Sequence, residues 1–334
     1  METVSIVLLF VIGIIIIIKG GDWFVESAVW VAKVTGIPNV IIGATIISIA
    51  TTLPEQLVSS IATYQGHYDV ALGNALGSVI CNLGLVLPIS LIFSPKQLVS
   101  KSLAIKSLFM LMSALILYYF SFDTLITSIE GIVLLLFCGF FLILNIIEVR
   151  RDEKALNKKT KDGKISKKML HRNMLRFLLG ALFIVLGARL LVNNGVKLAS
   201  MLGVSEQIIS LTLVAFGTSL PELVTAITSI LKKEYGISVG NIIGANILNM
   251  LMVVGFSSQL SKGGLELSYQ IASFGREVSY FIPQTLYFDL PVAILMISIL
   301  TLAGIFLKKL NRSLGVALLL TYIAYLTTLI TVFI

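Results

Sequence analysis

Two segments of the sequence, 167 residues apart, carry the same acidic and hydroxyl residues in the same order. Thr51-Thr52-Leu53-Pro54-Glu55 aligns with Thr218-Ser219-Leu220-Pro221-Glu222. The same offset, without a gap, aligns Gly73-Asn74 with Gly240-Asn241 and Asn82 with Asn249. Between positions 45 and 83, eleven of 39 residues are identical to their partners, whereas chance would give roughly one in fifteen to twenty. The sequence therefore contains an internal duplication that repeats a potential binding motif.

The two glutamates of this motif lie within long apolar stretches. Away from their ends, the stretches 38–64, 70–93, 206–231 and 237–260 contain two ionisable acidic or basic residues, Glu55 and Glu222. A carboxylate at the centre of a bilayer costs about 3 kcal/mol or more. Such a group must be protonated, paired with a distant base such as Arg189 or Lys197, or bound to a cation. Two equivalent carboxylates brought face to face repel unless a divalent ion or a proton lies between them, so the duplication favours a cation site over a purely structural role.

Hydroxyl groups and backbone carbonyls accompany both glutamates. Ser48, Thr51 and Glu55 can share one helix face, as can the aligned residues Ala215, Thr218 and Glu222. Pro54 and Pro221 donate no backbone hydrogen bond, which predicts an interruption in each helix and a free carbonyl oxygen four residues earlier. Free carbonyls at membrane depth are tolerated where they line a polar cavity, and there they can coordinate ions.

Asparagines form a second polar stripe in each half. Asn74, Ser78 and Asn82 recur every four residues, and their partners are Asn241, Ala245 and Asn249. Asn74 and Asn241 suit hydrogen bonds between helices, whereas Asn82 and Asn249 better suit ligation. All the candidate ligands are oxygens, since neither histidine lies in the stripes, and oxygen ligands indicate Ca²⁺, Mg²⁺, Na⁺ or protons. Six to eight oxygens from interrupted helices favour Ca²⁺ over Mg²⁺.

The composition places these motifs in a membrane. Of 334 residues, 57% are hydrophobic and 13% are charged, and the mean hydropathy is +0.99. A soluble protein of this length needs more charge on its surface. Apolar runs long enough to cross a bilayer predict an all-α polytopic membrane protein. Cys81 and Cys138 lie inside apolar runs and suggest neither a disulfide nor a zinc site.

Ten transmembrane helices are predicted, in two five-helix repeats. Their ranges are 4–33, 38–64, 70–93, 102–121, 125–148, 173–199, 206–231, 237–260, 287–307 and 314–334. Residues 1–149 form the first repeat, 150–172 a basic loop and 173–334 the second repeat, with 261–286 as a long loop that contains an interfacial segment. Because each repeat has an odd number of spans, the second repeat is inverted relative to the first.

The distribution of basic residues predicts the orientation of the chain. The segment from Arg150 to Arg176 holds eleven of the 25 basic residues, which makes it cytoplasmic by the positive-inside rule. Both termini are then extracellular, and the first apolar run, which follows no basic segment, is a span rather than a cleaved signal peptide. The net charge of +8 comes from basic residues that lie mainly in loops between the apolar segments, a distribution that indicates membrane topology rather than nucleic-acid binding. We expect membrane lipid and inorganic cations as partners, no cofactor, and a monomer.

These motifs resemble those of the cation/Ca²⁺ exchanger superfamily, sodium–calcium exchanger type. That family carries G-T-S-L-P-E followed by G-N-x-x-G-S-N in each of two inverted repeats. In the first half of this chain the two segments read Ala50-Thr51-Thr52-Leu53-Pro54-Glu55 and Gly73-Asn74-Ala75-Leu76-Gly77-Ser78-Val79. In the second half they read Gly217-Thr218-Ser219-Leu220-Pro221-Glu222 and Gly240-Asn241-Ile242-Ile243-Gly244-Ala245-Asn246. The resemblance implies Ca²⁺ ligation by Glu55 and Glu222 with groups around Thr51 and Thr218. It also implies that Ser48, Ser78 and Ala215 match positions that flank this site and at which the family binds sodium. It also implies that Asn82 and Asn249 complete the central site and that the helices 4–33 and 173–199 slide during alternating access. Thr52 and Ser219 belong to the same candidate set.

Departures from the family pattern leave the coupling ion open. Ala245 replaces the usual serine, and Asn249 stands where some sodium-coupled members carry aspartate. We predict a cell-membrane antiporter that exchanges Ca²⁺ for Na⁺, with Ca²⁺/H⁺ exchange through the same site as the alternative. A channel or a scaffold is less compatible with an inverted repeat. Enzymatic activity is not expected, because the sequence shows neither a nucleophile–base pair nor a nucleotide-binding loop.

Overall fold

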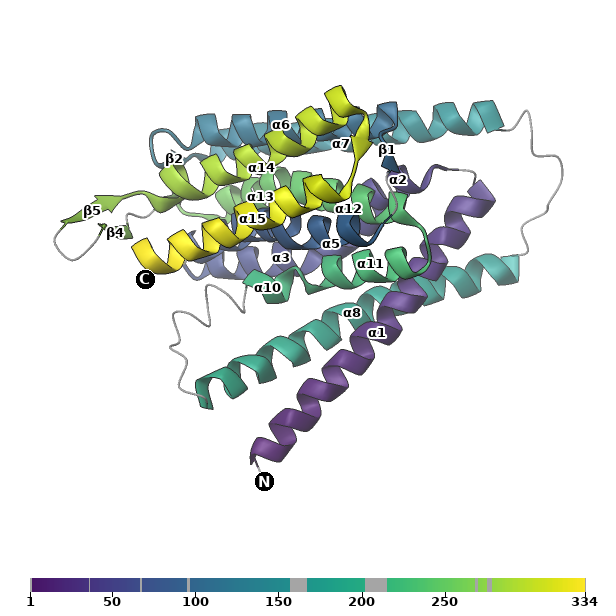
Figure 1. Ribbon diagram of the computed structural model, residues 1–334, viewed down its shortest axis with the longest axis horizontal. Coiled ribbons are helices and arrows are strands. Elements are labelled where there is room, and N and C mark those ends of the chain that lie inside the picture. Colours follow the sequence, from purple (N-terminus) through teal and green to yellow (C-terminus); the bar gives the residue numbers. More distant parts are fainter. Residues whose placement is uncertain are drawn as a thin grey trace. The chain divides into compact units, whose positions relative to one another are not determined.

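Long apolar helices dominate the computed structural model of the chain (Figure 1). The structure describes residues 2–35, 37–66, 68–94, 97–156, 167–201, 215–267, 270–274 and 278–333. By packing, the chain separates into two compact units. The first comprises Met1–Thr51 with Phe141–Asn241, and the second comprises Thr52–Phe140 with Ile242–Ile334.

The first half of the chain contains seven α-helices and two π-helical segments within the described residues. In order they are α1 (Glu2–Thr35), α2 (Asn39–Ile42), η1 (Gly43–Ile47), α3 (Ser48–Tyr64), α4 (Tyr68–Cys81), η2 (Asn82–Val86), α5 (Leu87–Phe93), α6 (Lys101–Phe120) and α7 (Ser128–Leu156). Two short strands, β1 (Gln97–Leu98) and β2 (Leu125–Ile126), flank α6.

The second half has a similar order of elements. It contains α8 (Lys167–Met201), α10 (Ala215–Thr218), α11 (Leu220–Leu231), α12 (Tyr235–Leu248), η4 (Asn249–Val253), α13 (Val254–Leu260), η5 (Thr285–Asp289), α14 (Leu290–Leu302), η6 (Ala303–Leu307), α15 (Arg312–Thr328) and η7 (Leu329–Phe333). Its strands are β3 (Leu265–Glu266), β4 (Gln270–Phe274), β5 (Val278–Ile282) and β6 (Lys309–Leu310).

The predicted spans agree closely with these helices. Among the described residues, nine helical stretches are long and apolar enough to cross a membrane. They are Val4–Val31, Asn39–Tyr64, Val70–Phe93, Lys101–Phe120, Ser128–Val149, Met169–Gly187, Tyr235–Leu260, Thr285–Leu307 and Arg312–Phe333. The remaining predicted span, 206–231, coincides with the shorter apolar helix Leu220–Leu231 and with residues that lie partly outside the described ranges.

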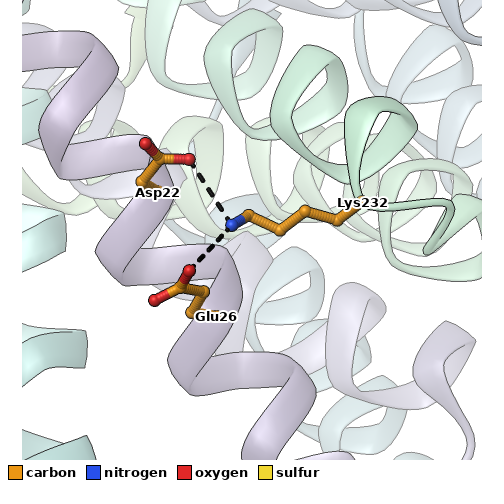
Figure 2. Close-up of polar contacts among 3 residues, drawn as sticks. All are labelled: Asp22, Glu26 and Lys232. Atoms are coloured by element: carbon orange, nitrogen blue, oxygen red, sulfur yellow. Dashed lines mark hydrogen bonds and ion pairs between the residues drawn. The ribbon is translucent and has the colours of Figure 1, made fainter.

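In the first unit, α1 packs along α8 and also against α11. Glycines allow α1 and α8 to approach closely. A β-carbon at Gly20 would lie 2.8 Å from the β-carbon of Phe183 and 2.9 Å from the Gly180 carbonyl oxygen. Phe24 stacks on Phe177 with ring centroids 4.5 Å apart. Ion pairs also join α1 to the end of α11. The Lys232 ammonium group lies 3.4 Å from an Asp22 oxygen and 3.1 Å from a Glu26 oxygen (Figure 2).

In the second unit, α4 packs against α14 and η4, while α15 packs against α5 and η2. The strands pair as three short antiparallel ladders: β1 with β6, β2 with β3, and β4 with β5. The β4–β5 ladder runs from Gln270 opposite Ile282 to Phe274 opposite Val278. Both strands lie in the stretch 261–286, for which the sequence predicted a long loop with an interfacial segment.

Helix ends extend into the predicted basic loop. α7 continues to Leu156 and α8 begins at Lys167, so both helices run beyond their predicted limits of 148 and 173. Residues 157–166 lie outside the described ranges. A charged helical turn outside the bilayer keeps its intrahelical hydrogen bonds, so a change in polarity alone does not end a helix.

Candidate cation-binding site

Prolines affect the two motif-bearing helices differently. In the second half, α10 ends at Thr218, Ser219 adopts φ −83° and ψ 2°, and α11 begins at Leu220 with Pro221 in its first turn. The interruption predicted at this proline is therefore confirmed. In the first half, α3 continues through Pro54, so the interruption predicted there is wrong. Pro54 removes one backbone hydrogen bond and crowds the carbonyl group of Ala50. A helix can continue through such a proline when its other backbone hydrogen bonds remain intact.

Glu222 lies on a buried polar face of α11 in the first unit. Its side chain is 0% exposed, as are those of Thr225 and Ser229, which lie three and seven residues later. The Thr51 hydroxyl approaches the Glu222 carboxylate, but within the described residues neither carboxylate oxygen has a hydrogen bond of normal geometry. The same unit therefore brings together two of the predicted ligands, Thr51 and Glu222.

Thr51 is held in place from α12. Its hydroxyl donates a hydrogen bond of 3.2 Å to the Oδ1 atom of Asn241. The backbones of η1 and α12 approach closely here, because a β-carbon at Gly43 would lie 2.4 Å from the Ile237 carbonyl oxygen and 2.8 Å from the Asn241 nitrogen. Asn241 thus serves as the interhelical hydrogen-bonding residue that the sequence predicted.

The described basic residues of the first unit do not neutralise Glu222. Arg189 and Lys197, the two bases considered as distant partners, are exposed, whereas Glu222 is fully buried. Lys232 pairs with Asp22 and Glu26 instead (Figure 2). Within the part of the chain that the structure describes, no ion pair reaches Glu222. A buried carboxylate in this setting is a strong candidate for binding a mobile cation.

Glu55 lies in the second unit, where α4 holds its helix. The side chain is 0% exposed, one turn after the buried Thr51 on α3. Asn74 of α4 donates hydrogen bonds of 3.2 Å to the Glu55 carbonyl oxygen and 2.9 Å to the Ser59 hydroxyl. Asn74 therefore joins α4 to α3, as predicted, and fixes the backbone that carries the glutamate.

Asn82 and Asn249 begin matching π-helical segments in the second unit. η2 spans Asn82–Val86 and η4 spans Asn249–Val253, so the two segments obey the 167-residue offset of the repeat. Both side chains are 0% exposed. Among the described atoms, Asn82 Oδ1 and both polar side-chain atoms of Asn249 have no hydrogen-bond partner. π-Helical turns are frequent at functional sites, and these turns present unused amide oxygens.

Asn246 joins this cluster, although the sequence analysis did not select it. Its Oδ1 atom accepts a hydrogen bond of 3.1 Å from Asn82 Nδ2, and it is fully buried. The second half matches the terminal asparagine of the G-N-x-x-G-S-N pattern with Asn246, whereas the first half carries Val79. The family motif therefore indicates Asn246 as a candidate ligand. A comparison of the two halves does not, because the aligned residue in the first half is Val79.

The remaining predicted ligands fall in the same two units. Ser48, Thr218 and Ser219 belong to the first unit, and Thr52 and Ser78 to the second. All five side chains are buried, while Ala215 begins α10. Because Glu222 and Glu55 belong to different units, their pairing stays a prediction. The 167-residue offset also aligns Gly36 with Gly203 and Thr45 with Thr212. Of these four residues, the structure describes Thr45.

Comparison with known proteins identifies the family of this chain. Residues 5–147 and 173–331 match the family described as "Sodium/calcium exchanger protein". The chain belongs to this family. The matched ranges cover both halves and omit the segment around the basic loop, so the resemblance of the motifs to sodium–calcium exchangers is confirmed.

Curated relatives of this exchanger-family chain match most of its length. A putative antiporter, CaxA, from Alkalimonas amylolytica is 32% identical over 94% of this chain and 95% of its own. The sodium/calcium exchanger MaX1 from Methanosarcina acetivorans is 28% identical over 96% of this chain and 97% of its own.

Solved structures of an exchanger share the fold of this family member. A structure of the sodium-calcium exchanger NCX_Mj, soaked with 10 mM Na⁺ and no Ca²⁺, has a TM-score of 0.81 and 29% identity, covering 98% of this chain and 99% of the other. The predicted fold class, an all-α polytopic membrane protein with ten helices in two inverted repeats, is thereby confirmed. The protein is an integral, multi-pass membrane protein.

Proposed function

We propose that this exchanger-family chain is a secondary antiporter that moves Ca²⁺ in exchange for Na⁺. The observation that carries the proposal is the burial of Glu55 and Glu222. Both are 0% exposed at equivalent positions of the duplicated motif. Carboxylates inside membrane spans mark ion pathways, and inverted repeats place ion sites near the bilayer midplane.

The ligands of the transported ions would all be oxygen atoms. Glu55 and Glu222 would be the principal Ca²⁺ ligands, with contributions from the groups around Thr51 and Thr218. Asn82 and Asn249 would complete the central site with their amide oxygens, which is supported by their burial and by the absence of hydrogen bonds to Asn82 Oδ1 and Asn249 Oδ1 among the described atoms. The positions of Ser48, Ser78 and Ala215 would flank this site and contribute to Na⁺ binding, and Thr52 and Ser219 would belong to the same cation site. Such a set matches the preference of Ca²⁺ for several oxygens in flexible geometry.

Exchange would follow from competition for the same two carboxylates. In the proposed pair, either Ca²⁺ or Na⁺ would relieve the repulsion between Glu55 and Glu222, and only a loaded site would permit the protein to reorient. The long helices α1 and α8 pack along one another, which supports the expectation that they move together during alternating access.

The proposal includes a location and an orientation. The chain would lie in the cell membrane with both termini outside and the basic segment 150–172 in the cytoplasm, because that segment and its flanks concentrate the basic residues. A monomer would suffice, since each chain carries both halves of the site.

Ca²⁺/H⁺ exchange through the same site is the second candidate. Ala245 supplies no hydroxyl where the family pattern has serine, and Asn249 supplies no charge where some sodium-coupled members carry aspartate. Both positions are fully buried in the second unit. Fewer oxygen ligands weaken Na⁺ binding, whereas the two carboxylates, paired as proposed, would suffice to carry protons.

The test is Ca²⁺ flux into vesicles that contain the purified protein, with Na⁺ and pH gradients imposed separately. We expect Ca²⁺ uptake to require an outward Na⁺ gradient. Uptake that depends on the pH gradient and ignores Na⁺ selects the second candidate. Glu55→Gln and Glu222→Gln should each reduce uptake more than 100-fold, because a neutral amide does not replace a buried anionic ligand, a loss of about 3 kcal/mol.

A matched control is Glu266→Gln, which changes an exposed glutamate of β3. Its uptake should equal that of the wild type. Tightly folded Glu55→Gln and Glu222→Gln proteins that still exchange Ca²⁺ at the wild-type rate would refute the paired-glutamate site.

A further inference from the structure

A third acidic side chain is buried within a membrane span, apart from the two glutamates. Asp289 is 8% exposed and ends the π-helical segment η5 inside the span Thr285–Leu307. The duplicated motifs do not include it, because the gap-free alignment of the two halves covers residues 45–83 and 212–250. An ionisable residue at such a place requires either a partner or a function.

Neutral hydrogen-bond donors surround the Asp289 carboxylate. The Tyr325 hydroxyl donates a hydrogen bond of 2.9 Å to Oδ1, and the Gln284 amide lies 3.3 Å from Oδ1 and 3.4 Å from Oδ2. Among the described residues, no lysine or arginine forms an ion pair with Asp289. Donors stabilise the anion, whereas burial stabilises the neutral acid. Opposing effects of this kind let a buried carboxyl group change its protonation state during function.

A chain of side-chain contacts leads from Asp289 to the turn that carries Asn82. The rings of Tyr325 and Tyr322 stack with centroids 6.5 Å apart. Tyr322 lies against the backbone of η2, since a β-carbon at Gly84 would be 2.4 Å from the Tyr322 β-carbon. The Tyr322 hydroxyl also interacts with the Cys81 thiol, which directly precedes Asn82.

We propose that Asp289 is a proton-binding site distinct from the paired glutamates, and that Tyr325 and Tyr322 transmit its charge state to Asn82. The carboxylate takes up one proton and becomes a neutral acid, so one of its oxygens changes from acceptor to donor. The hydrogen bond from the Tyr325 hydroxyl to Asp289 then weakens or is lost. The Tyr325 ring shifts as a result, and its contact with the Tyr322 ring changes. The transmission to Asn82, but not the proton site, rests on the proposed function.

Other ionisable groups near η5 define the alternatives. Besides Tyr322 and Tyr325 of α15, η5 itself carries Tyr287, which is exposed. α14 carries none. α4, which also packs against η5, carries Tyr68, Cys81 and Asp69, and the side chain of Asp69 lies outside the described part of the structure. Asp69 is therefore the competing carboxyl group.

The decisive measurement is an infrared titration of the purified protein in lipid nanodiscs. Protonation of Asp289 should produce a carboxylic acid C=O band that appears as the pH falls. Asp289→Asn should remove this band, and Asp69→Asn, the matched control, should retain it. Tyr325→Phe keeps the carboxyl group but deletes a donor to the anion, so the band should appear at a pH about one unit higher. The band should persist in Glu55→Gln, which separates this proton site from the proposed cation site.

Equilibrium binding of radioactive Ca²⁺ to the same samples tests the transmission. The dissociation constant of the wild type should change about fivefold across the titration of the band, and this change should vanish in Asp289→Asn. A band that survives Asp289→Asn, that disappears in Asp69→Asn, or that does not shift in Tyr325→Phe overturns the proton site. An unaltered pH dependence of Ca²⁺ affinity in Asp289→Asn overturns the transmission.

Discussion

The same glycine of the duplicated motif has opposite surroundings in the two halves. Gly240 is buried on α12, and a β-carbon there would lie 2.3 Å from the Val40 carbonyl oxygen and 3.1 Å from its α-carbon. Gly73, its repeat partner, is exposed on α4, and a β-carbon there would meet nothing within 4 Å. Gly240→Ala and Gly73→Ala are therefore the same chemical change with opposite expected results.

The expected magnitudes follow from these distances. Carbon and oxygen atoms pack at about 3.4 Å or more, so alanine at 240 must move α12 away from Val40 by about 1 Å. Overpacking of this kind costs about 1–3 kcal/mol. The shift also lengthens the 3.2 Å hydrogen bond from Thr51 to the neighbouring Asn241 beyond a useful distance. At Gly73, alanine gains about 1 kcal/mol of helix propensity without a clash.

The assay compares thermal unfolding of both variants in detergent with Ca²⁺ uptake in vesicles. Gly240→Ala should unfold several degrees below the wild type and lose most of its uptake, because Thr51 leaves its position beside Glu222. Gly73→Ala should unfold at or above the wild-type temperature and retain its uptake. Equal effects at the two positions, or a Gly240→Ala protein as stable as the wild type, would refute the close approach of α12 to Val40.

Three further predictions test other contacts. Asn74→Ala should destabilise the fold by about 1–2 kcal/mol, because two hydrogen bonds to α3 are lost; thermal unfolding measures this, and Ca²⁺ affinity of the folded protein should persist. Lys232→Met should lower the unfolding temperature by no more than a degree or two, about 0–1 kcal/mol, since its partners are half exposed; the difference should disappear in 1 M salt. Ala245→Ser should lower the Na⁺ concentration for half-maximal exchange several-fold if Na⁺ binds there, and an unchanged Na⁺ dependence would count against Na⁺ coupling at this position.

The location of the spans was predictable because bilayer thickness sets one length scale for every helix. The predicted span 70–93 and the observed Val70–Phe93 agree at both ends. The β4–β5 ladder was not predictable from hydropathy, since its strands are short and mix polar with apolar residues. Pro54 misled the prediction for a different reason. A proline removes one hydrogen bond in either half, and whether the helix then ends depends on packing that sequence does not display.

The sequence by itself determined the membrane class, the duplication and the candidate ligands, because hydrophobicity, repeat spacing and oxygen chemistry are properties of the residue types. The tertiary structure decided which oxygens already have partners. In the structure, Asn74 and Asn241 form hydrogen bonds between helices, whereas Asn82 Oδ1 and the side chain of Asn249 have no hydrogen-bond partner among the described atoms. The tertiary structure also joined Asp289 to Tyr325 across 36 residues. Such contacts depend on how helices pack in three dimensions, and side-chain periodicity along one helix does not specify its neighbour.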